Sequence, residues 1–182
     1  MNEEKACRLG IRRLREDVSI PQRAHLGDAG LDIAAAEDCY LEPGEAKAIP
    51  TGIALDIPLG YEVQVRPRSG LSLRTPLRLP NSPGTIDHGY RDELKIIMAN
   101  QSCHCMVKDP TACYTLEQAN GQQGRYLIRK GERIAQLVVS KLCPVDLVEV
   151  QETTTSHDFN RGGGFGSSGV GALEKKDSEP TL

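Results

Sequence analysis

The clearest strand signal in the sequence is YEVQVR, residues 61–66, in which apolar and polar side chains alternate. This period of two is typical of a β-strand with one buried face. The alternation recurs at residues 53–57, and short apolar runs rich in β-branched residues occur at 94–98 and 134–139. The one short helix candidate starts near Ser69, with a hydroxyl as its expected cap. Many short strands separated by turns predict an all-β sandwich or barrel.

The length and charge of the chain limit its organisation and its partners. At 182 residues the chain is long enough for one hydrophobic core and too short for two large ones. A net charge of -3 gives no global basic field, so we expect no nucleic-acid partner. No apolar run reaches the length of a membrane span, and the first thirty residues carry repeated charge. We therefore expect a cytoplasmic protein with no membrane partner.

The composition divides the chain into segments. We expect a single β-barrel domain over residues 1–170, in which residues 101–125 form a polar inserted loop. Residues 156–170 are expected to form a mobile glycine-rich arm, and the charged residues 171–182 a disordered tail.

The six cysteines are expected to be free thiols, because no export signal accompanies them. One group, Cys103, His104, Cys105 and Cys113, contains the ligand types of a zinc site. Adjacent ligands in a single cluster are a poor match to the usual paired C-x₂-C spacing. Free thiols in a loop are the interpretation we prefer, with metal binding as the alternative.

Three segments carry residue types that suit a nucleotide. Residues 67–70 (PRSG) follow a strand and combine a guanidinium, a hydroxyl and free backbone N–H groups, which together bind phosphate well. Residues 84–93 (GTIDHGYRDE) look like a hairpin that presents an aspartate able to deprotonate a water. Residues 161–169 (RGGGFGSSG) expose backbone N–H groups on five glycines. Taken singly, these segments also fit a capped turn, a turn with a buried Tyr and a flexible linker.

Taken together, and in this order, the segments resemble the trimeric deoxyuridine triphosphatases (dUTPases), which carry five ordered motifs. The matching stretches are residues 29–33 (AGLDI), 67–70, 84–93, 131–137 (GERIAQL) and 161–169. The resemblance implies a jelly-roll-like β-barrel that forms a homotrimer with exchange of C-terminal arms. It also implies hydrolysis of dUTP to dUMP and pyrophosphate by attack of water on the α-phosphorus. That activity limits uracil incorporation into DNA and supplies dUMP for dTTP synthesis.

The resemblance also implies roles for single residues. Asp87 would be the catalytic residue, binding the 3′-hydroxyl and activating the water, and Tyr90 would stack under the sugar and exclude a ribose. Asp32 would support the residues of the catalytic site without contacting the substrate itself. Mg²⁺ would be held through the substrate phosphates, with no direct protein ligand. The other substrate-binding positions would be Arg68, Ser69, Gly70, Asn81, Gly84, Thr85, Ile86, Lys95, Gln136, Arg161, Phe165, Gly166, Ser167 and Ser168.

Three positions depart from the family pattern. Asp92 stands where the family usually has Gly, and we expect it to tolerate a left-handed backbone. Leu31 replaces a common aromatic in the core. The spacing from Arg161 to Phe165 is one residue shorter than usual, which puts the role of Arg161 in question.

Two other functions compete with this one. A dCTP deaminase on the same fold would be expected to lack the Asp87–Tyr90 segment and the glycine-rich motif, and both are present here. A non-catalytic trimer used as a binding scaffold would not need an intact Asp87, Arg68, Gln136 and Tyr90. The inserted segment, to which no role carries over, leaves room for a binding function in an active enzyme.

Overall fold

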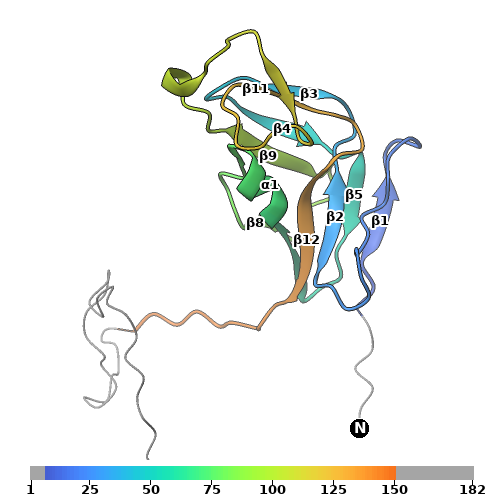
Figure 1. Cartoon of the computed structure of the whole chain (residues 1–182). Helices are drawn as coiled ribbons and strands as arrows, with labels where there is room; N and C mark the ends of the chain where they lie inside the picture. The colour runs from blue at the N-terminus through green and yellow to red at the C-terminus, as the bar shows by residue number, and fades with distance from the viewer. Residues whose placement is uncertain (1–6, 151–182) are drawn as a thin grey trace, which may run out of the picture. The chain divides into compact units, whose positions relative to one another are not determined.

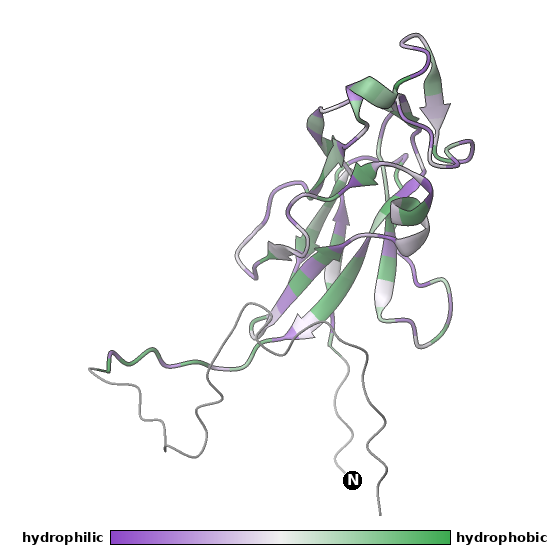
Figure 2. Cartoon of the chain, turned by 60° about the vertical axis from the view of Figure 1, so that its left-hand side comes forward, coloured by the Kyte–Doolittle hydropathy of each residue, from purple (hydrophilic) through white to green (hydrophobic). Residues whose placement is uncertain are grey.

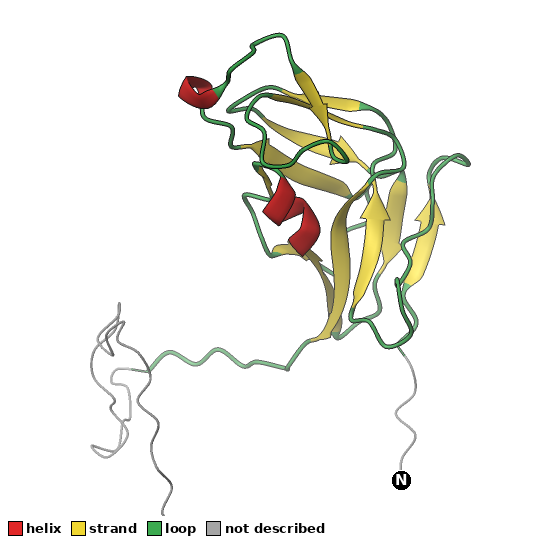
Figure 3. Ribbon diagram, viewed as in Figure 1, coloured by secondary structure: helices red, strands yellow, loops and turns green. Residues whose placement is uncertain are grey.

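The computed structural model describes residues 7–150 and consists mainly of short strands (Figure 3). Within that range, helix is confined to α1 (Ser69–Arg74) and to a single 3₁₀ turn, η1 (His104–Met106). None of these helices is long and apolar enough to cross a membrane. The all-β expectation is confirmed.

The largest sheet contains the strand predicted at residues 61–66. Its order is β2 (Gly30–Ala34), β12 (Arg133–Lys141), β6 (Tyr61–Arg66) and β8 (Gly84–Ile86), and every neighbouring pair is antiparallel. Figure 1 shows β2 and β12 running side by side. Both valines of β6 are buried, as the alternation predicts.

Three smaller sheets complete the fold. All of their strand pairs are antiparallel except β10 with β11. Their orders are β4 (Ala46–Pro50), β9 (Lys95–Asn100), β7 (Leu77–Arg78); β10 (Cys113–Thr115), β11 (Arg125–Ile128), β3 (Cys39–Leu41); and β1 (Gly10–Arg13) with β5 (Ile53–Asp56).

The core is formed by the inward faces of these sheets. Apolar and polar residues alternate along several strands in Figure 2, and the apolar ones include the fully buried Ile33, Ile49, Met98 and Ile134. Each such side chain contributes about 1.5–3 kcal/mol when it leaves water. The described residues up to Pro144 form one compact unit around this core.

Two local predictions are wrong. Residues 84–93 do not form a hairpin, because β8 pairs with β6 whereas β9 pairs with β4 and β7 in another sheet. The segment between them, the 87–94 loop, therefore crosses from one sheet to the next. The hydroxyl cap of α1 is also absent: the N-cap is Arg68, which makes no side-chain capping bond. The helix begins at Ser69 itself, so this hydroxyl lies inside the first turn.

The inserted segment 101–125 is more ordered than a loop. It contains η1 and β10, and Ala119 within it is fully buried. Its ends are fastened by Asn100, whose Nδ2 donates to Leu41 O at 3.0 Å and to Gly124 O at 2.8 Å. The predicted arm at 156–170 and tail at 171–182 lie outside the described residues.

Candidate active site

Strand register brings the first site residues together. Asp32 on β2 is the direct partner of Gln136 on β12, which is in turn the partner of Arg66 on β6. The chain leaves β6 at Pro67, and Gln136 Nε2 donates a hydrogen bond to Pro67 O at 2.8 Å. The start of α1 is therefore held directly beside Asp32.

Asp32 is bonded to two arginines. Arg68 Nε donates to Asp32 Oδ1 at 2.8 Å, and Arg68 Nη2 donates to Oδ2 at 3.3 Å. Arg133 Nη1 donates to Asp32 Oδ2 at 2.9 Å, while Arg68 Nη1 donates to Arg133 O at 3.1 Å. The side chains of Asp32 and Arg68 are only 17% and 28% exposed, so this ion pair is partly shielded from water. The triad carries a net charge of about +1.

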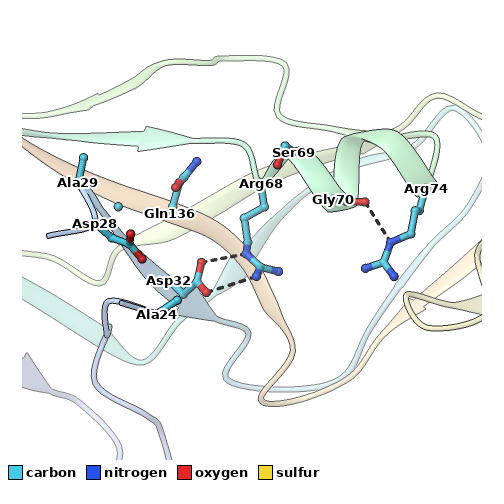
Figure 4. A pocket seen from close by; sticks show the side chains of 10 residues that line it. Ala24, Asp28, Ala29, Asp32, Arg68, Ser69, Gly70, Arg74 and Gln136 are labelled. Carbon is cyan, nitrogen blue, oxygen red and sulfur yellow. Dashed lines mark hydrogen bonds and ion pairs between the residues drawn. The ribbon is translucent and has the colours of Figure 1, made fainter. Parts of the chain in front are cut away.

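A pocket of about 430 Å³ opens beside this triad. Its lining includes five of the residues predicted to act here: Asp32, Arg68, Ser69, Gly70 and Gln136 (Figure 4). Gly30 also lines it, and a Cβ at Gly30 would lie 2.3 Å from Gln136 Oε1. Only glycine allows β2 to approach Gln136 so closely.

Sequence reasoning missed two arginines. Arg133 lies within the 131–137 motif, where only Gln136 had been given a role, and a β-bulge between Arg133 and Ala135 shifts the local register. Arg74 lines the pocket, one helical turn after Gly70, and its Nε donates to Gly70 O at 3.2 Å (Figure 4). The i, i+4 spacing of Gly70 and Arg74 in a helix is the sequence signal that could have found Arg74.

The remaining described site residues lie on β8, on the 87–94 loop and nearby, and they do not line this pocket. Asp87 is exposed, and Tyr90 N donates to Asp87 O at 3.1 Å. Tyr90 OH donates to Glu93 O at 2.9 Å, which restricts the orientation of the ring. The others of this group are Asn81, Gly84, Thr85, Ile86 and Lys95.

The 87–94 loop is fastened at its end to the strands below it. Thr51 Oγ1 donates to Leu94 O at 2.6 Å, and Gly52 N donates to Glu93 Oε1 at 2.8 Å. Asp92 is exposed, and its φ is not positive, since Asn120 is the one described non-glycine residue with positive φ. The loop therefore needs no left-handed backbone at Asp92, and the tolerance of Asp for that conformation is not called upon.

Two further predictions concern Leu31 and the C-terminal substrate-binding positions. Leu31 is partly buried and packs against the core. The substrate-binding positions Arg161, Phe165, Gly166, Ser167 and Ser168 lie outside the described residues.

The cysteine prediction needs a correction. Cys103 and Cys105 form a disulfide, because the turn at η1 brings their Cα atoms to 5.4 Å, within the usual range for such a bond. Cys39, Cys113 and two others are free. Burial raises the pKa of the Cys113 thiol, which disfavours the thiolate that a zinc ion requires. Within residues 7–150, no group of three His, Cys, Asp or Glu side chains is placed to hold a metal.

This arrangement suits the binding of a polyphosphate. The pocket offers guanidinium groups, a serine hydroxyl and an amide in a fixed frame, which are the donors that phosphate oxygens accept. A separate loop presents the exposed carboxylate of Asp87, able to activate a water, three residues before Tyr90, whose ring could pack against a sugar.

Sequence comparisons identify related proteins. Residues 16–110 match the family model described as dUTPase. The deoxyuridine 5'-triphosphate nucleotidohydrolase of Clostridium kluyveri is 42% identical over 161 residues, which cover 88% of this chain and 96% of the relative. That of Thermobifida fusca is 42% identical over 172 residues, which cover 94% and 84%.

Solved structures agree with the sequence relatives. A mutant dUTPase of Staphylococcus bacteriophage 80alpha with dUpNHpp matches at a TM-score of 0.79 and 35% identity, covering 90% of this chain and 99% of that chain. A mutant dUTPase of phage phi11 of S. aureus, which coordinates a structural Mg(II) ion, matches at a TM-score of 0.72 and 34% identity, covering 80% and 97%. The dUTPase fold expected from the sequence is confirmed.

Proposed function

The chain belongs to the dUTPase family, and we infer that it is a dUTP diphosphatase, which hydrolyses dUTP to dUMP and pyrophosphate. The observation that carries this conclusion to the chain's own residues is the pocket where Arg68, Ser69, Gly70 and Gln136 meet. We propose that the activity operates in the cytoplasm, limits uracil incorporation into DNA and supplies dUMP for dTTP synthesis.

The phosphates of dUTP bind in this pocket. Arg68 has five N–H donors, of which three are used in bonds to Asp32 and Arg133 O, so about two remain for phosphate oxygens. Ser69 adds a hydroxyl, and Gly70 allows a phosphate to approach the backbone. Catalysis of phosphoryl transfer depends mainly on such positioning and charge neutralisation.

Asp87 acts as the general base. It takes a proton from water as the water oxygen attacks the α-phosphorus, and the bond from that phosphorus to the α,β-bridging oxygen breaks, so that pyrophosphate leaves. Tyr90, fixed by its bonds to Asp87 O and Glu93 O, places its ring against the sugar and leaves no room for a 2′-hydroxyl.

Uracil is bound by the neighbouring strands. Asn81 lies against Gly84, where a Cβ would come within 3.2 Å of Asn81 Nδ2, so the amide is placed beside the backbone of β8. Thr85, Ile86 and Lys95 contribute further backbone groups to the base. Closure over the nucleotide belongs to Arg161, Phe165, Gly166, Ser167 and Ser168, which are proposed from the family resemblance.

The active enzyme is a homotrimer with shared sites. The phosphate-binding residues surround one pocket, and Asp87 and Tyr90 are not part of its lining. A site that joins the two groups from neighbouring subunits accounts for this separation, since closed cyclic assemblies place different surfaces of identical chains together.

Mg²⁺ is the proposed cofactor, held through the phosphates of dUTP. The donor set fits this mode, because the described residues contain no cluster of three potential ligands and the Asp32 carboxylate is already occupied by two arginines. Mg²⁺ prefers to keep several waters and to bind substrate phosphates. When bound, it neutralises charge on the triphosphate.

The test is pyrophosphate release measured with dUTP, dCTP, dTTP and UTP in the presence of Mg²⁺. A dUTP diphosphatase releases pyrophosphate from dUTP far faster than from the other three. Release of ammonia from dCTP would instead identify a deaminase. Absence of turnover, with tight binding of dUTP, would identify a non-catalytic scaffold.

A further inference from the structure

Arg74 differs from the other arginines around the phosphate pocket in having no carboxylate partner. Arg68 and Arg133 both pair with Asp32, whereas no ion pair within residues 7–150 involves Arg74. Among the described residues, its side chain donates one hydrogen bond, from Nε to Gly70 O. Both Nη groups therefore remain available, at the wall of a pocket that already contains the phosphate-binding residues.

The position of Arg74 is fixed from two sides. Its Nε bond to Gly70 O orients the guanidinium along α1 (Figure 4). Its carbonyl accepts a hydrogen bond from Gly121 N at 2.8 Å, which comes from the inserted segment. The inserted segment thus holds the backbone of Arg74, and the Nε bond restricts its side chain, which loses less entropy when it binds an anion than a free surface arginine does.

The inserted segment also forms part of the adjoining cavity. Leu116 and Glu117 line a space of about 330 Å³ together with Arg68, Arg74 and Arg133. The insertion thus contacts the C-terminal end of α1, where Arg74 lies. Arg68 and Ser69 lie at the N-terminal end of the same helix. It gives this chain a support for Arg74 that comes from outside the helix.

We propose that Arg74 is a further phosphate-binding residue, which contacts the β- or γ-phosphate of dUTP and is held in place by the inserted segment. The inference rests on the proposed function. An uncompensated guanidinium beside a polyphosphate pocket gains a charge-assisted hydrogen bond when the substrate enters. The contact falls on the outer phosphates because Asp87, which acts at the α-phosphorus, does not line this pocket.

The test compares Arg74→Gln and Arg74→Lys with the wild-type full chain. Dissociation constants are measured for dUpNHpp with Mg²⁺, which has all three phosphates, and for dUMP, which has only the first. We expect Arg74→Gln to weaken binding of dUpNHpp roughly 10- to 100-fold and to leave dUMP binding unchanged, with Arg74→Lys in between. Arg125→Gln is the matched control, since it removes an exposed arginine paired with Glu42 away from the pocket.

Each outcome decides the question. Unchanged binding of dUpNHpp to Arg74→Gln overturns the proposal, and so does an equal loss for dUpNHpp and dUMP, which would mean that Arg74 acts only on the shape of the site. A loss of the same size in Arg125→Gln would reduce the effect to general electrostatics. Failure of the wild-type protein to release pyrophosphate from dUTP would reject the proposed function instead, so the two failures are distinguishable.

Discussion

Asp32 and Arg68 form a two-point ion pair, with 2.8 Å between Oδ1 and Nε and 3.3 Å between Oδ2 and Nη2. This pair joins the middle of β2 to the residue that precedes α1, although 36 positions separate the two in sequence. The planar guanidinium is thereby held in one orientation before any phosphate arrives. Preorganised donors of this kind are the main protein contribution to phosphoryl transfer.

Replacing the carboxylate tests this preorganisation. Asp32→Asn keeps the size of the side chain but removes the charge shared by Arg68 and Arg133, so the two guanidinium groups are left facing each other. We expect kcat/KM for dUTP to fall about 10-fold or more, and the free energy of unfolding to fall by about 1–3 kcal/mol. Asp28→Asn is the control, because Asp28 lines the same pocket but its carboxylate accepts, among the described residues, only from His25 N. Equal losses in both variants would show that the ion pair has no special role.

The anchor of the inserted segment predicts a loss of stability that is separable from catalysis. Asn100 is 1% exposed, donates to Leu41 O and Gly124 O, and accepts from Ser102 N. Asn100→Ala removes all three bonds, although Gly124 O keeps a bond from Ser102 Oγ, and we expect a loss of about 2–4 kcal/mol in urea unfolding. Asn120→Gly, at an exposed position with positive φ, should change stability by less than about 0.5 kcal/mol. A small effect at Asn100 would mean that the insertion is not fastened there.

The sequence predicts the strands better than it predicts their partners. The alternation at residues 61–66 marks β6, because half-burial leaves a local signature in every second residue. The hairpin predicted at 84–93 fails because the assignment of β8 and β9 to different sheets depends on contacts with distant strands. Likewise, motif order identifies Arg68 and Gln136, whereas the contact of Arg133 with Asp32 depends on a bulge that no local pattern shows.

The insertion shows the same limit. Its polar composition indicates a loop, but Ala119 within it is fully buried and Cys103 pairs with Cys105. Neither feature follows a sequence period, because the burial of Ala119 depends on contacts with other elements and the disulfide depends on the local turn at η1.

Ionisation of Tyr126 should lower the free energy of unfolding at alkaline pH. This side chain is fully buried, and burial raises the pKa of its phenol to about 12. Because the folded-state pKa lies above the unfolded value of about 10, the contribution is complete below pH ~10 and is lost as the pH rises toward 12. We expect the urea-derived free energy of unfolding to drop by up to about 2 kcal/mol more in the wild type than in Tyr126→Phe over this window. Tyr40→Phe, at an exposed position, is the control and should lose as much stability as the wild type over this window.

Sugar selection should depend on the ring of Tyr90 and not on its hydroxyl. Tyr90→Ala opens space beside C2′, so the ratio of kcat/KM for dUTP over UTP should narrow by about 10-fold or more. Tyr90→Phe keeps the ring and loses the bond to Glu93 O, so it should retain the ratio. An unchanged ratio in Tyr90→Ala would place the discrimination elsewhere.

The separation of Asp87 from the pocket of Arg68 leads to a test of the shared site. Asp87→Asn should bind dUpNHpp normally and lose about 10²- to 10⁴-fold in turnover, because an amide cannot accept the proton from water. Arg68→Gln should lose phosphate binding, while Asp32 keeps Arg133 as a partner. If one site takes Asp87 from one subunit and Arg68 from another, mixed trimers contain some sites in which both residues are intact. Equal, random mixing gives about one intact site in four over all trimers, and one in three within each mixed trimer.

The experiment co-refolds the two variants, each carrying a different tag, and isolates the mixed trimers by sequential purification. Every isolated mixed trimer contains one intact site in three, so we expect about a third of wild-type kcat/KM, against almost none in either variant alone. The physical reason is that the phosphate donors and the general base reside on surfaces that one chain does not bring together around its pocket. Mixtures no more active than the sum of the separate variants, with mixed trimers confirmed by light scattering and tag recovery, would show that each chain completes its own site. Light scattering that finds only monomers would reject the trimer itself.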